Sequence, residues 1–372
     1  MLIYILLTIV TVGFAAFVNN GTGKSKYTED RTRFVNVVAV AAIFGLLFLV
    51  SALRVGIGND YYRYVEFINR ITFDSYVPTE PGFNLLVKLC NIVFGNENAI
   101  AVFAVIAFLT LGIFLKAIYD QSISFGWTFF LFMTLGYYFQ TLNTVRYYLA
   151  LTLVLYSMRY VMKKQYGRFV VMVLIASLFH KSALLVIPVY ILAALPWKKW
   201  MVIAGSAFIA VFGISAYFFN DFYMQLLVRL YPSYEGTGLL VGGTSVVNIL
   251  RCAGVLFLAV ICMQKKEQWE LEERFYFYLN YGALLLYVFC SFIPQISRIC
   301  YYLTISQILY IPLLLQKIAE NKKKMIWKIL VAVAACLYFL LFLYRARADE
   351  IGIVPYHSWL FTEKLDYKGT WE

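Results

Sequence analysis

The sequence predicts an all-α membrane protein, built as a polytopic bundle of transmembrane helices. Its residues are 62% hydrophobic and only 14% charged, whereas soluble domains are about 45–50% apolar and about 25% charged. Apolar windows recur along the whole chain, and short polar connections separate them. Because each span takes roughly 20 residues, the 372 residues are used up by one integral membrane domain, which we place at 1–344.

The hydropathy rule gives about twelve membrane segments. They cover residues 1–18, 34–53, 98–118, 124–140, 144–162, 169–180, 182–195, 201–219, 246–263, 275–293, 300–316 and 325–344. The first window lacks a basic n-region and a clear small-residue cleavage site, so we interpret it as a retained span and not as a signal peptide.

The polar connections predict which ends of the segments face the cytoplasm. Five connections are short and mostly basic, at 22–33, 159–168, 197–200, 264–274 and 316–325. Basic connections favour the cytoplasmic side. Alternation then places the N-terminus outside, together with 54–97, 140–144, 180–182, 220–245, 293–300 and a C-terminal extracytoplasmic tail at 345–372.

Three stretches depart from simple spans. Residues 80–95 are too short to cross comfortably and are predicted to lie along the outer face or to dip into it. The short windows at 169–180 and 182–195 suit a broken helical hairpin with His180 and Lys181 at its outer turn. The glycine-containing outer loop at 220–245 is predicted to act as a lid over a substrate.

Charge and cysteine usage exclude several other classes of protein. The net charge of +12 comes from clusters between apolar runs, so a nucleic-acid partner is not indicated. The six cysteines form no CxxC motif and no cluster with histidine, so the sequence predicts neither a metal site nor a disulfide framework. It predicts no cofactor.

Four arginines lie at the predicted outer ends of segments, where the orientation rule does not call for them: Arg54, Arg146, Arg251 and Arg298. Any one of them could extend to lipid headgroups. As a set, they favour a shared site for an anion, because a guanidinium presents a rigid fork of donors that matches a phosphate. We therefore expect Arg54, Arg146 and Arg298 to converge, with Arg251 and Lys181 as weaker members.

Tyrosines and amides accompany these arginines. The neighbours that we predict for the site are Asp60, Tyr61, Tyr64, Asn143, Tyr147, Tyr301 and Tyr302. Tyrosine combines an apolar ring with a hydroxyl, so it can both stack on a sugar and hydrogen-bond to it. An ordinary aromatic belt at the membrane surface is the alternative. For Asp60 the alternative is a carboxylate at the start of a helix that begins at Asn59.

Five stretches of the chain occur in a characteristic order: "LRVGIGNDYYRYVEFI" (53–68), "EPGFNLLVKL" (80–89), "NTVRYYLAL" (143–151), "IASLFHKSALL" (175–185) and "ISRICYYLTISQILYIPLLL" (296–315). In these stretches and in their order, the chain resembles the EpsG family of bacterial polysaccharide polymerases. The family's common "GTDY" is "GNDY" here, with Asn59, and Tyr147 replaces the glutamine that usually follows the arginine.

The resemblance implies an enzyme of the bacterial inner membrane with its active site facing outward. Its relatives in function are the Wzy-type O-antigen and capsule polymerases, and its architecture would be similar to membrane glycosyltransferases that use lipid-linked donors. The donor and the acceptor would be undecaprenyl-diphosphate-linked oligosaccharides, and membrane lipids, a flippase and a chain-length regulator would be its partners. A diphosphate leaves as a stable anion, so arginines could assist it without a metal ion.

The base that takes the proton of the attacking hydroxyl stays open among Asp60, Glu80 and His180. A histidine with a pKa near 6.5 is mostly neutral at pH 7 and can accept a proton. For His180, a hydrogen bond to a backbone carbonyl at a helix break is the alternative. Two other functions are also considered: a flippase of lipid-linked sugars, which needs polar groups near the midplane, and a membrane acyltransferase with His180 as base.

Overall fold

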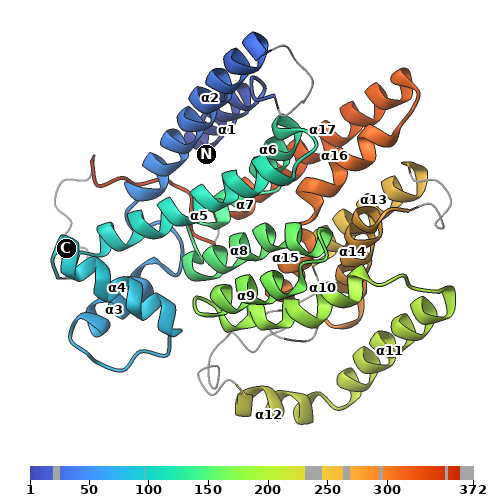
Figure 1. Ribbon diagram of the computed structural model, residues 1–372. Helices are drawn as coiled ribbons and strands as arrows, with labels where there is room; N and C mark the ends of the chain where they lie inside the picture. Colours follow the sequence, from blue (N-terminus) through green and yellow to red (C-terminus); the bar gives the residue numbers. More distant parts are fainter. Residues whose placement is uncertain are drawn as a thin grey trace. The chain divides into compact units, whose positions relative to one another are not determined.

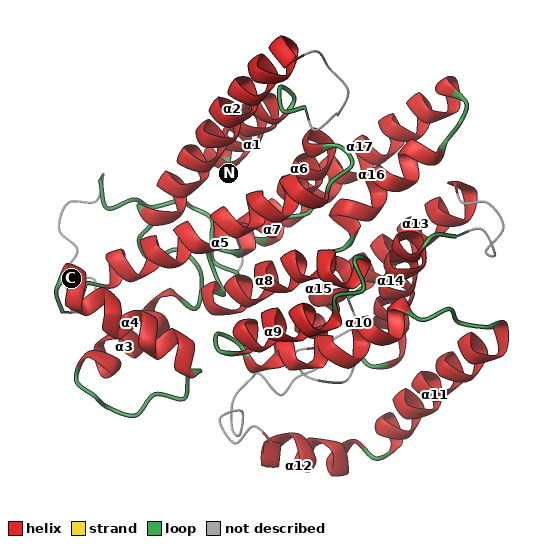
Figure 2. Cartoon of the chain, viewed as in Figure 1, coloured by secondary structure: helices red, strands yellow, loops and turns green. Residues whose placement is uncertain are grey.

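The computed structural model describes residues 1–19, 26–96, 98–230, 245–262, 269–291, 293, 296–347 and 351–360. Over this part of the chain the secondary structure is helical, and Figure 2 shows helices joined by loops with no strand. A single isolated β-bridge joins Arg54 to Ser358 in these residues. The predicted all-α class is therefore confirmed.

The chain forms two compact units. Unit 1 comprises residues 1–156, 175–181 and 319–372, and unit 2 comprises residues 157–174 and 182–318. Unit 1 contains α1 (Leu2–Ala15), α2 (Lys26–Ala52), α3 (Tyr61–Thr72), α4 (Pro81–Phe94), α5 (Ala99–Gln121), α6 (Phe125–Thr134), α7 (Tyr137–Gln140), most of α8 (Val145–Met162) and α17 (Asn321–Arg345).

Unit 2 takes most of α9 (Tyr166–Ser177) and the 3-10 helix η1 (Lys181–Leu185). It also contains α10 (Val186–Ala194), α11 (Lys199–Phe218), α12 (Asn220–Leu230), α13 (Val246–Cys262), α14 (Leu271–Phe289), α15 (Ile296–Thr304) and α16 (Gln307–Lys317). The α-helices of both units are labelled along the chain in Figure 1.

Each predicted apolar window coincides with one helix or with two consecutive helices. Five stretches are long and apolar enough to cross a membrane: Arg31–Ala52, Ala99–Gln121, Lys199–Phe218, Ile296–Lys317 and Asn321–Arg345. The remaining windows form shorter helices, so the number of twelve crossings stays a prediction. The helical hairpin at 169–195 is broken as predicted, because α9 ends at Ser177 and η1 begins at Lys181.

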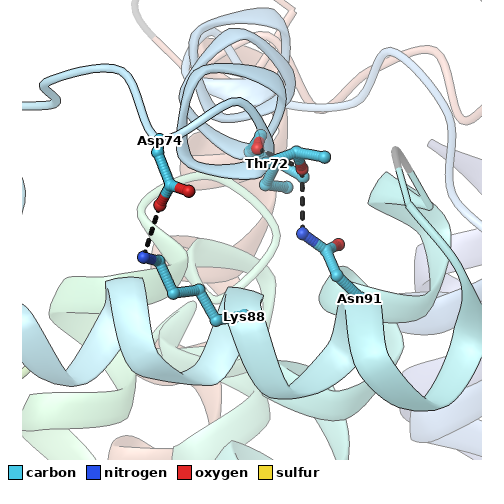
Figure 3. A network of polar contacts seen from close by, with 5 residues as sticks. Thr72, Asp74, Lys88 and Asn91 are labelled. Carbon is cyan, nitrogen blue, oxygen red and sulfur yellow. Dashed lines mark hydrogen bonds and ion pairs between the residues drawn. The ribbon is translucent and has the colours of Figure 1, made fainter.

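Inside unit 1, α3 and α4 pack against each other and against α5. Their buried faces form one hydrophobic cluster that includes Phe67, Phe83 and Phe103. Beyond that cluster, the ammonium of Lys88 lies 2.6 Å from a carboxylate oxygen of Asp74. The two helices are joined again by the Asn91 amide, which donates to the Thr72 hydroxyl at 2.9 Å, as Figure 3 shows.

The 14-residue helix α4 has two unlike faces. One face is buried in the cluster, and the other exposes four apolar side chains at helical spacing, Leu85, Leu89, Ile92 and Val93. A helix of this length with an uncovered apolar face suits the membrane surface better than a crossing. Its interfacial placement stays a prediction.

The segment at 351–359 docks against the loop that follows α2. The backbone N–H groups of Val55 and Gly58 donate to the carbonyls of His357 and Gly352, at 3.1 and 2.9 Å. The N–H of Trp359 donates to the carbonyl of Leu53 at 3.1 Å. Part of the predicted C-terminal tail is thus an ordered partner of the Arg54 loop. Of the predicted lid at 220–245, residues 220–230 form the helix α12 and not a loop. Residues 231–244 lie outside the described part.

Candidate functional site

The predicted site residues divide between the two units. Those in unit 1 are Arg54, Asp60, Tyr61, Tyr64, Glu80, Asn143, Arg146, Tyr147, His180 and Lys181, and those in unit 2 are Arg251, Arg298, Tyr301 and Tyr302. The convergence of Arg298 with Arg54 and Arg146 therefore stays a prediction. Unit 1 carries a connected group of these residues.

An ion pair between Arg146 and Glu80 lies at the centre of this group. Nη1 of Arg146, at the start of α8, donates to Oε2 of Glu80, which caps the start of α4. Both side chains are mostly buried, at 15% and 14% exposure. Oε1 of Glu80 accepts the backbone N–H of Lys181 at 3.2 Å. One carboxylate therefore ties together three segments that are distant in the sequence.

The backbone explains why these three segments approach so closely. The N–H of Gly82 donates to the carbonyl of Leu178 at 2.8 Å. A Cβ atom at residue 82 would lie only 2.7 Å from that oxygen. Only glycine fits at position 82, because a side chain there would clash with the Leu178 carbonyl. The "EPG" sequence at 80–82 therefore supplies both the Glu80 carboxylate and the close backbone contact that positions it.

An aromatic wall surrounds the Arg146 guanidinium. Its central carbon lies 5.4 Å from the ring centre of Phe83, 5.6 Å from that of Tyr64 and 6.0 Å from that of Phe67. A cation within about 6 Å of an aromatic face is attracted to it. Nε of Arg146 is buried, and no described residue accepts a hydrogen bond from it. This N–H is therefore a donor that the described residues leave unsatisfied.

Arg54 lies against the same aromatic cluster but is covered. It is only 2% exposed, its Nη1 donates to the carbonyl of Ser51, and its guanidinium lies 4.8 Å from the ring centre of Phe103. The Phe103 ring stacks on Tyr61 at 4.8 Å and meets Tyr64 edge-on at 6.4 Å. The rings connect the surroundings of the two arginines.

Burial also changes the acidity of Arg54, which follows the end of α2. Loss of solvation lowers its pKa to about 10, although Tyr61, Tyr138, Tyr4 and Tyr356 act in the opposite direction. The guanidinium still carries its charge at pH 7. A buried charge of this kind destabilises the folded state. Residues that destabilise the fold are common at functional sites.

Asn143 fixes the start of α3. Its Oδ1 accepts the backbone N–H of Asp60 at 3.1 Å. Gly58, with φ +91°, lies so close that a Cβ atom would be 2.8 Å from the Asn143 Cα. The helix begins at Tyr61 with Asp60 as its N-cap residue, slightly later than the predicted start at Asn59. Asn143 therefore shapes the loop that carries Asp60.

His180 lies beside Tyr147, with the ring centres 5.2 Å apart in an edge-to-face arrangement. His180 is partly exposed, and the neighbouring Lys181 side chain is exposed. Because Glu80 accepts the N–H of Lys181, the histidine is one residue from the ion pair. The structure brings all three predicted bases into unit 1, on segments that this network connects.

In unit 2 the predicted residues have other partners. Nη2 of Arg251 donates to the Thr304 hydroxyl at 3.3 Å. The hydroxyls of Ser182 and Tyr302 lie 3.1 Å apart, and Tyr190 donates to the Tyr302 carbonyl. Arg298 and Tyr301 are partly exposed on α15, which confirms the helix predicted to carry them.

Sequence reasoning missed Phe67 and Phe83 beside Arg146 and Phe103 beside Arg54. It also missed the docked segment at 351–359. In an apolar chain, a phenylalanine that faces an arginine has the same appearance as one that faces lipid. The pair of Gly352 and Pro355 signalled a turn in the tail, but its partner could not be inferred. In the described residues there is no cluster of three metal-ligating side chains.

A model described as the EpsG family matches residues 37–358. The match begins inside α2 and ends in the docked segment, so it includes every predicted site residue. No curated protein and no solved structure matches the chain.

Proposed function

The chain belongs to the EpsG family, and from this premise we propose that it is a polysaccharide polymerase that uses lipid-linked oligosaccharides on the outer face of the bacterial inner membrane. The donor is a glycan on undecaprenyl diphosphate, and the acceptor is the non-reducing end of another lipid-linked repeat. Exopolysaccharide, capsule and O-antigen are the polymers that such an enzyme makes.

The proposed reaction forms one glycosidic bond and breaks one. A hydroxyl oxygen of the acceptor attacks the anomeric carbon of the donor. The bond from that carbon to the diphosphate oxygen breaks, and its electron pair leaves with undecaprenyl diphosphate. The hydroxyl proton passes to a base of the protein. The main requirement is therefore stabilisation of the negative charge that grows on the diphosphate.

Arg146 is the group that we assign to this task. The supporting observation is its setting: a guanidinium held between Glu80 and an aromatic wall, mostly buried, with an Nε–H that no described residue uses. Interactions with charge are stronger in such a partly dry place than in water. Arg54 lies behind the same aromatic cluster and adds positive potential.

We propose that Glu80 positions Arg146 and does not act as the base. Both of its oxygens already accept hydrogen bonds, from Arg146 and from the Lys181 N–H. His180 and Asp60 remain as proton acceptors. His180 is the better candidate, because its ring is partly exposed and one residue from the ion pair.

The test is polymer formation by the purified protein. Wild-type protein incubated with its lipid-linked repeat should give a ladder of products on a gel. Arg146→Ala should slow the reaction on the order of 10²–10³-fold, the usual effect of losing one group that stabilises developing charge. The matched control is Arg70→Ala, since Arg70 on α3 is half exposed and pairs with Glu66 at the surface.

A ladder made by Arg146→Ala at the wild-type rate would remove Arg146 from the mechanism. Transfer of the substrate across vesicles without lengthening would identify a flippase instead. Transfer of an acyl group to the sugar would identify an acyltransferase.

A further inference from the structure

Unit 2 contains a cavity of about 240 Å³ that the proposed polymerase reaction does not use. Its walls come from α10, α11 and α14, and small residues such as Ala193, Gly205 and Gly282 leave the space open. Trp197 closes one side: its indole N–H donates to the Leu192 carbonyl at 2.7 Å, which fixes the ring.

The lining of the cavity is apolar. Three lining residues carry hydroxyls, Ser206, Tyr278 and Tyr281. Ser206 donates to the Val202 carbonyl at 2.6 Å and lies 2.8 Å from the Tyr281 hydroxyl. An apolar cavity of this kind stays dry and accepts apolar ligands. The occupant therefore has a hydrocarbon part.

The helix α11, which forms one wall, has the length and composition of a membrane span, and only 11% of its apolar window is buried. Ile203, Phe208 and Val211 are each exposed by more than half. An exposed apolar face of this kind suits contact with lipid chains.

Charge lies at the end of the same helix. Lys198 and Lys199 directly follow Trp197 and begin α11, at the end of the span where lipid headgroups lie. Both side chains are exposed, and among the described residues no carboxylate lies within ion-pair distance of either. Trp200, 65% exposed, adds an aromatic side chain suited to the headgroup level.

We infer that this place is a binding site for an anionic membrane phospholipid. One acyl chain of the lipid enters the cavity, and the phosphodiester of its headgroup lies at Lys198 and Lys199. Two lysines suit a singly charged phosphodiester, since an ammonium acts as a point charge, whereas the diphosphate of the donor is assigned to the arginine fork of Arg146. The inference does not depend on the proposed polymerase function.

Native mass spectrometry of the delipidated full chain tests the site with two probes of equal chain length, phosphatidylglycerol and phosphatidylcholine. Phosphatidylglycerol should bind more tightly. The Lys198→Ser, Lys199→Ser double variant should weaken phosphatidylglycerol binding roughly 30-fold, at about 1 kcal/mol for each lysine. The matched control is Lys163→Ser with Lys164→Ser, another exposed lysine pair in unit 2, which should change nothing.

The cavity itself is tested by filling it. A Cβ atom at Gly282 would meet only the end of the Leu303 side chain, at 3.4 Å, so Gly282→Leu should fill the space and weaken both lipids. Gly254→Leu on α13 is the control, because nothing lies within 4 Å of a Cβ atom there.

Equal binding of both lipids, unaffected by the lysine variant, would overturn the inference. Tighter binding of undecaprenyl phosphate than of phosphatidylglycerol would also overturn it and assign the cavity to the lipid-linked substrate.

Discussion

The two arginines of unit 1 that the sequence singles out lie in contrasting surroundings. Arg54 is almost completely covered and hydrogen-bonds to the carbonyl of Ser51. Arg146 keeps some exposure and pairs with a carboxylate that also holds the turn before Lys181. Both lie on one aromatic cluster. This difference in exposure supports our proposal that Arg146 contacts the ligand directly and that Arg54 contributes through its charge.

The covering of Arg54 has a clear structural source. The segment at 351–359 runs along the loop at 53–59, and the Tyr356 hydroxyl donates to the Val50 carbonyl at 3.0 Å. Tyr4 donates to the carbonyl of Ile353 at 2.7 Å. The 351–359 segment, itself held by Tyr4 of α1, thus covers the Arg54 loop. The Arg146 region is held by the Glu80 contacts and by the close approach at Gly82.

Arg54→Met gives the largest expected change in stability. Burial lowers the pKa of Arg54 from the ordinary arginine value to about 10, so its charge opposes folding by on the order of 3 kcal/mol at pH 7. That cost is fully present below the folded-state pKa and is lost as pH rises through it towards the ordinary arginine value. The variant should therefore raise Tm, and it should lower polymer formation about tenfold because the positive potential is lost.

Thermal unfolding in detergent and the gel assay measure these two effects. A fall in Tm with unchanged activity of the folded fraction would show that Arg54 is a structural residue.

Gly58→Ala tests the loop that positions Arg54 and Asp60. Gly58 has φ +91°, and a Cβ atom there would lie 2.8 Å from the Cα of Asn143. The strain should cost about 1–3 kcal/mol and lower Tm. Gly45→Ala, in an open position within α2, is the control and should be neutral or slightly stabilising. Equal Tm values for the two variants would contradict the close approach of the loop to Asn143.

Glu80→Gln tests whether the charge of the Glu80 carboxylate orients the Arg146 guanidinium. The amide keeps the size of the side chain but loses its charge, so Arg146 should be less well oriented. Polymer formation should fall on the order of tenfold, with kcat affected more than KM. Glu66→Gln, which breaks an exposed pair with Arg70, should leave the rate unchanged. A Glu80→Gln enzyme whose activity disappears completely would instead favour Glu80 as the base.

Lys88→Met should have the smallest effect. The Lys88 ammonium lowers the pKa of the exposed Asp74 carboxyl by hydrogen bonding to it and by its charge. The stabilisation is therefore present above the unfolded-state pKa of the aspartate and disappears as pH falls through the lowered folded-state value. The loss of Tm caused by Lys88→Met should be small near neutral pH and absent in acid. A loss as large as that from Gly58→Ala would assign the α3–α4 junction in Figure 3 a larger role.

Hydropathy predicted the positions of the helices, whereas the predicted site residues stay a prediction. The helix breaks at Asn143 and at His180, and the helix start at Arg146, lie where the sequence places them. Local polarity marks such breaks, because an arginine or an amide in an apolar run must lie near an end of a membrane segment. The pairing of Glu80 with Arg146 could not be inferred, since it depends on how two distant helix starts meet.

The difference in exposure between Arg54 and Arg146 could not be predicted from the sequence either. Arg54 and Arg146 appeared equivalent as sequence positions, since each ends or begins an apolar segment beside tyrosines. Their difference comes from the docked 351–359 segment and from the gap beside Gly82. Both features are long-range backbone contacts that leave no periodic signal.

The most direct measurement is the affinity of the purified protein for undecaprenyl diphosphate, compared between wild type and Arg146→Ala under conditions where both are folded. If Arg146 binds the leaving diphosphate, the variant should bind undecaprenyl diphosphate about 10–100-fold more weakly. This is the loss of affinity expected when one or two charged hydrogen bonds are removed. Equal affinities would contradict the account, because the anion would then be held elsewhere.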